Sequence, residues 1–125
     1  MIQPFVEKFD ANREVLREKF KVSAPELYSD IVRAVVEILS DAYAYGEPDP
    51  MRIHEIDDYS DSEGALLFVI GAKGRIASYW AVFVGYGSCS ENDMLKYIQE
   101  ESDADARADK CLTLALHIVQ GLKEI

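Results

Sequence analysis

Residues 65–86 read ALLFVIGAKGRIASYWAVFVGY. The run Ala65–Ile70 is continuously apolar, which is typical of a strand buried on both faces or nearly so. Gly71–Gly74 is rich in glycine and predicts a tight connection. Ile76–Tyr86 is long enough for a second strand and too short for a membrane-spanning helix, which needs about 20 residues. We therefore predict a β-hairpin at the centre of the fold.

The second strand of this hairpin is apolar on both sides. Alternation puts Trp80 with Val82 on one side and Tyr79 with Phe83 on the other. Helices can cover one face, and a partner subunit is a reasonable cover for the second. We expect a homodimer, with an interface drawn from Tyr79, Trp80, Phe83 and Tyr86. Stacking of nucleic-acid bases on these aromatic rings is disfavoured, because such a groove needs basic residues and only Lys73 and Arg75 are nearby in the sequence.

Two helices are predicted before the hairpin. In the first, Phe5, Phe9, Leu16 and Phe20 recur at helical spacing, and Asn12 interrupts the stripe. The second is predicted to begin at a capping box, Ser23–Glu26, and to end near Tyr45 and Gly46, before two prolines. Opposite charges three residues apart predict ion pairs along the first helix, namely Asp10 with Arg13, Glu14 with Arg17 and Glu18 with Lys21.

Met51–Asp57 alternates and predicts a first strand, and two helices are expected after the hairpin, from Ser90 to about Gln99 and from Asp103 to Leu122. The order α-α-β-β-β-α-α separates helices from strands, which indicates an α+β fold with helices packed on a small antiparallel meander. The 125 residues, 49% of them hydrophobic, suit a single domain over residues 1–125.

The charge is strongly negative and unevenly spread. The net charge is −10: residues 41–63 carry eight acids against Arg52, or −7, residues 91–109 carry seven acids against two bases, or −5, and the remaining residues sum to +2. Such a surface steers toward a basic partner and argues against direct binding of nucleic acid. The alternative interpretation is that these acids lie in solvated loops and only keep the protein soluble. A calcium loop at 57–64 lacks the acid spacing of an EF-hand. The expected partner-binding acids are Asp49, Glu55, Asp57, Asp58, Asp61 and Glu63.

The turn Gly85–Asp93 contains the one candidate nucleophile, Cys89, near the start of a predicted helix. A helix N-terminus lowers a thiol pKa, whereas the adjacent Glu91 and Asp93 raise it. No base lies between Arg75 and Lys96. A structural turn is therefore favoured over a catalytic thiol. His54 and His117 have no metal-ligand spacing with the two cysteines, so no metal or cofactor is expected.

Residues 86–90, Tyr-Gly-Ser-Cys-Ser, followed by Asp93 and Leu95, resemble a signature of small uncharacterised bacteriophage and prophage proteins. The resemblance covers about ten residues. It departs at Glu91 and Asn92, where that pattern has Gly and a second Cys. It implies a mobile-element origin and no activity.

The resulting expectation is a small acidic cytoplasmic protein that inhibits a basic host or toxin protein. Free thiols and the lack of a secretory signal or membrane span favour the cytoplasm. The alternatives are a thiol-dependent enzyme centred on Cys89 and a structural or assembly subunit.

Overall fold

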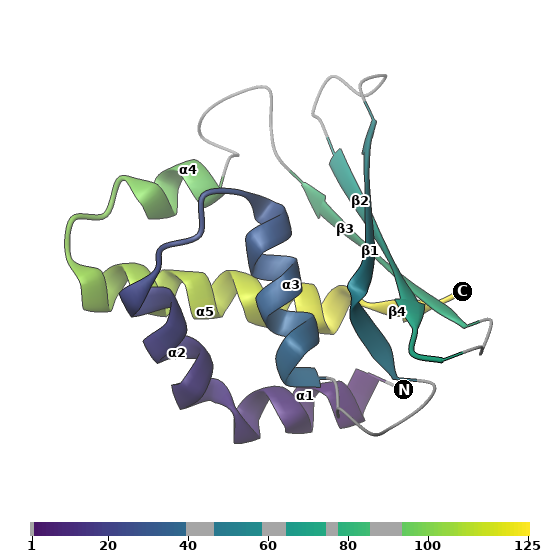
Figure 1. Cartoon of the computed structure of the whole chain (residues 1–125). Helices are drawn as coiled ribbons and strands as arrows, with labels where there is room; N and C mark the ends of the chain where they lie inside the picture. Colours follow the sequence, from purple (N-terminus) through teal and green to yellow (C-terminus); the bar gives the residue numbers. More distant parts are fainter. Residues whose placement is uncertain (1, 40–46, 59–64, 75–77, 86–93) are drawn as a thin grey trace.

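The computed structural model describes residues 2–39, 47–58, 65–74, 78–85 and 94–125. They form an α+β fold, as predicted, with helices packed on an antiparallel sheet (Figure 1). The elements are α1 (Ile2–Ala11), α2 (Arg13–Val22), α3 (Tyr28–Leu39), β1 (Pro48–Asp58), β2 (Ala65–Ala72), β3 (Tyr79–Gly85), α4 (Met94–Gln99), α5 (Ala104–Gly121) and β4 (Lys123–Glu124).

The sheet is a meander in the order β1-β2-β3-β4. The predicted hairpin is β2–β3, in a register that places Phe68 opposite Val82 and Ile70 opposite Trp80. Gly74 in its connection has φ of 81°, a conformation that glycine adopts at no steric cost. The short strand β4, which was not predicted, pairs with Trp80 and Ala81. The sheet therefore has β4 at one edge and β1 at the other.

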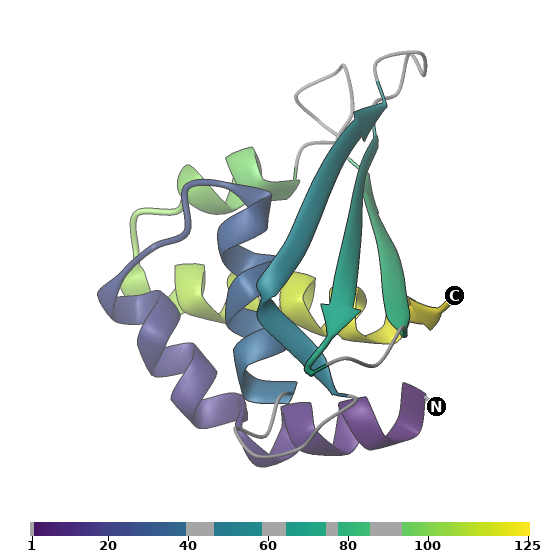
Figure 2. The same ribbon diagram turned by 45° about the vertical axis from the view of Figure 1, so that its right-hand side comes forward.

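The helices lie on one side of the sheet in both views (Figures 1 and 2). The layer between them is the hydrophobic core. The fully buried side chains include Phe9 and Leu16 from the N-terminal helices, Val35 from α3, Ala115 from α5 and Phe68 from β2. Side chains from all the larger elements therefore meet in one core, since helix stripes of period 3.6 pack against a strand face of period 2.

The N-terminal segment differs from the prediction in two places. It breaks at Asn12, whose side-chain amide donates to the Lys8 carbonyl at 2.9 Å, so one predicted helix is two, α1 and α2. The predicted capping box at Ser23 is wrong. The Ser23 amide closes α2 on the Lys19 carbonyl at 2.9 Å. The carboxylate of Asp30 instead accepts the amides of Glu26 and Leu27 ahead of α3.

Candidate functional site

The side of the sheet away from the helices carries an exposed apolar row. Side chains of β1, β2 and β3 are in register across it, with Leu67 opposite both Ile56 and Phe83. Phe83 is 71% exposed, Ile56 49% and Tyr79 46%. No described helix covers this side in either view (Figure 2). We call it the outer face; its apolar members are Ile56, Leu67, Val69, Tyr79, Ala81 and Phe83, and the exposed His54, paired with Val69, lies on the same side.

The structure divides the predicted interface residues between the two sides of the sheet. Tyr79 and Phe83 lie on the outer face, on the opposite side from Trp80, as the alternation predicted. Trp80 itself is 5% exposed and packs edge-on against Phe5, with ring centroids 6.2 Å apart. Its assignment to an interface is therefore wrong, because the helices already bury it. Tyr86 lies outside the described residues.

Of the predicted partner-binding acids, the structure describes the side chains of Asp49 and Glu55. Asp49 accepts the Met51 amide at 2.9 Å and pairs with Arg52 at 3.7 Å, which gives it a local structural role. Glu55 is exposed and lies six residues further along β1, beyond the irregularity between Pro48 and Ile53. The two acids are thus separate. The last two strand positions belong to Asp57 and Asp58, paired with Leu66 and Ala65, while Asp61 and Glu63 lie outside the described residues.

Two acids of the segment 91–109, Asp105 and Asp109, connect α5 to α2 through ion pairs. Arg17 of α2 pairs with Asp109 at 2.8 Å and with Asp105 at 3.3 Å, and Lys21 pairs with Asp105 at 3.0 Å. The hydrogen bond and charge of Lys21, with Arg17 beside it, lower the pKa of the Asp105 carboxyl. The predicted i,i+3 ion pair of Asp10 with Arg13 forms at 3.8 Å. Arg17 and Lys21 instead have their side-chain ion pairs with residues of α5, far away in the sequence.

A groove of about 460 Å³ opens on the helix side of the sheet, between the start of α3, α4, β1 and β2. Its apolar wall includes Leu27, which is 62% exposed, with buried Leu66 and Leu95. Glu26 and Glu55 bring carboxylates from opposite elements, and neither forms an ion pair with another described side chain. We call this the Glu55 groove, lined by Glu26, Leu27, Tyr28, Glu55, Leu66, Leu95 and Gln99.

Hydrogen bonds shape the rim of the Glu55 groove. The Tyr28 hydroxyl accepts the Leu95 amide at 3.1 Å and fixes the start of α4 against α3. The Gln99 amide donates to the Glu26 carbonyl at 3.1 Å. Two hydrogen bonds between segments about 70 residues apart therefore connect opposite walls of the groove. Sequence reasoning singled out Glu55 but missed Glu26 and Leu27, because no local pattern links them.

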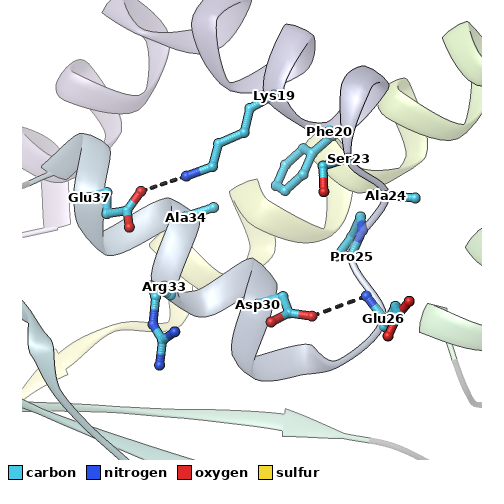
Figure 3. A pocket seen from close by; sticks show the side chains of 10 residues that line it. All are labelled: Lys19, Phe20, Ser23, Ala24, Pro25, Glu26, Asp30, Arg33, Ala34 and Glu37. Carbon is cyan, nitrogen blue, oxygen red and sulfur yellow. Dashed lines mark hydrogen bonds and ion pairs between the residues drawn. The ribbon is translucent and has the colours of Figure 1, made fainter.

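A second hollow lies between α2 and α3 (Figure 3). Its charged groups are largely engaged within the protein. Lys19 pairs with Glu37 across it, and Asp30 accepts the Glu26 amide at its far end. Figure 3 shows Arg33 extending away from that ion pair. With a volume of about 330 Å³, this hollow is best explained as the seam between two helices.

The cysteines offer no reaction centre within the described residues. Cys89, the candidate nucleophile, lies outside them. Cys111 is buried in α5, and burial raises the pKa of its thiol to about 11, although the charge of nearby Arg107 opposes the shift. The described residues contain no group of three or more His, Cys, Asp or Glu placed to hold a metal ion. None of their helices is long and apolar enough to cross a bilayer.

The comparisons with known proteins return nothing: no family model, curated protein or solved structure matches this chain.

Proposed function

We propose that this chain is a non-enzymatic binding protein that acts as an inhibitor or antagonist of a basic protein, and that the outer face is its main contact. The observation that supports this is the aligned row of Ile56, Leu67 and Phe83 on three strands, with Phe83 71% exposed. Single exposed apolar residues are common, but a contiguous patch is typical of a surface that binds another molecule. Aromatic residues at the centre of such a patch supply much of the binding energy.

The charge of the sequence that follows Arg52 supports a basic partner. No Lys or Arg occurs between Arg52 and Lys73, whereas this interval contains Glu55, Asp57, Asp58, Asp61 and Glu63. An acidic flank beside an apolar centre accelerates association with a positively charged protein. The proposed mobile-element type depends only on the resemblance at residues 86–90. The thiol-enzyme alternative depends on Cys89 and remains a prediction.

The first test is capture of host proteins on the immobilised chain, followed by their identification by mass spectrometry. Phe83→Ser should abolish retention of the specific partner, because it removes the centre of the outer face. Val15→Ser is the matched control, since Val15 is 65% exposed on α2, on the helix side. A partner retained equally by wild type and Phe83→Ser would contradict the proposal.

The second test concerns the sign of the partner's charge. Reversing Asp57, Asp58 and Asp61 to Lys should slow association and weaken its dependence on salt. Stopped-flow or surface-plasmon measurements at two ionic strengths give both quantities. Association that is indifferent to salt and to these substitutions would show that the acids only keep the protein soluble.

A further inference from the structure

We infer that the Glu55 groove receives the long cationic side chain, lysine or arginine, of a basic protein partner. This inference rests on the proposed function and adds the chemistry of one anchoring contact. A lysine or arginine has an aliphatic stem and a charged end, so it suits a site with apolar walls and carboxylates at the rim. The groove has both, in Leu27, Leu66 and Leu95 and in Glu26 and Glu55.

The apolar wall is the first step of the argument. Leu27 is 62% exposed although Leu66 and Leu95 beside it are buried. A methylene stem laid along Leu27 removes apolar surface from water on both molecules, which is favourable. A purely polar ligand leaves this wall exposed. The occupant therefore needs an apolar stem.

The charge of the groove is the second step. Glu26 and Glu55 have no cationic partner among the described side chains, and none of the described residues that line the groove is a Lys or Arg. The start of α3 does not attract an anion here, because Asp30 already accepts the amides of Glu26 and Leu27. A cation from another molecule complements the site.

Continuity with the outer face is the third step. Glu55 and Ile56 are consecutive residues of β1, on opposite sides of the sheet, and β1 is an edge strand. A partner that covers Ile56 therefore reaches Glu55 by passing around one strand edge. The outer face and the Glu55 groove become two sides of one binding surface.

The test uses N-acetyl-arginine methylamide and N-acetyl-lysine methylamide as probes of the full-length protein labelled at leucine methyl groups. Methyl resonances of Leu27, Leu66 and Leu95 should shift with a dissociation constant on the order of millimolar. The citrulline analogue keeps the length of the arginine side chain and the 2-aminoheptanoic acid analogue keeps that of lysine, each without the charge, and both should bind at least fivefold more weakly. Shifts of equal size with the neutral analogues would overturn the inference.

Variants assign the binding to the groove. Glu55→Gln and Glu26→Gln should each weaken cation binding by about two- to fivefold, as expected for exposed charge pairs. Glu7→Gln with Glu124→Gln is the matched control, since both are exposed carboxylates away from the groove. Unchanged affinity in Glu55→Gln and Glu26→Gln overturns the inference. The loss of captured partner in Phe83→Ser is measured separately, so failure of the groove is distinguishable from failure of the proposed function.

Discussion

Two residues of β3, Trp80 and Phe83, should respond differently to truncation. Loss of the Trp80 ring should lower the stability of the fold, whereas loss of the Phe83 ring should lower binding and change stability little. Trp80 is 5% exposed and contacts Phe5, so Trp80→Ala removes a buried ring and should cost about 3–5 kcal/mol. Phe83 is 71% exposed, which leaves 29% of its surface to lose. At 1.5–3 kcal/mol for complete burial, Phe83→Ala should cost only about 0.4–0.9 kcal/mol.

The assay is urea denaturation of wild type, Trp80→Ala and Phe83→Ala, followed by circular dichroism. With a slope of about 2 kcal/mol per M, the midpoint should fall by about 2 M in Trp80→Ala and by less than about 0.5 M in Phe83→Ala. Trp80→Phe is a useful third variant. The Trp80 indole nitrogen is buried and has no hydrogen-bond partner among the described residues, so Trp80→Phe, which keeps an aromatic ring and removes this donor, should cost less than Trp80→Ala.

The result that refutes the reasoning is a loss of 2 kcal/mol or more in Phe83→Ala. Such a loss would show that the protein itself covers Phe83, and the outer face would not be available to a partner. A small loss in Trp80→Ala would equally contradict the burial of Trp80 against the helices. The two variants therefore test the fold and the proposed binding surface together.

Three further outcomes are expected. Lys21 lowers the pKa of the Asp105 carboxyl, so the contribution of this ion pair to stability is complete above the unfolded-state pKa of about 3.9 and is lost as the pH falls through the folded-state pKa. The difference in unfolding free energy between wild type and Asp105→Asn should therefore shrink below about pH 4, as measured by urea titration. Iodoacetamide should label Cys111 very slowly near neutral pH, because burial raises its pKa to about 11, and rapid labelling of Cys89 well below pH 8.5 would favour the thiol-enzyme alternative. Light scattering decides whether a second copy competes for the outer face: a dimer that Phe83→Ser converts to the 14.1 kDa monomer would assign Phe83 to the predicted homodimer, and a wild-type monomer at high concentration would contradict the dimer and leave this face to the basic partner.

Local patterns were sufficient for the fold class and for the hairpin. The period-2 alternation of Ile76–Tyr86 separates Trp80 from Phe83, and the helical stripes before and after it are read from residues three and four apart. These features depend on neighbours in the chain. The break at Asn12 is a smaller case: the sequence shows a polar residue in an apolar stripe, but only the structure shows that the helix ends there.

Packing decided the features that join distant segments. Both sides of β3 are apolar, so the sequence could not tell which side the helices cover; the core places Trp80 inside and leaves Phe83 outside. Arg17 pairs with Asp105 across 88 positions, and the Glu55 groove depends on a hydrogen bond between residues 67 positions apart. Contacts of this separation depend on how helices and sheet pack together, because no periodicity in the chain encodes which charged groups of two distant elements will meet.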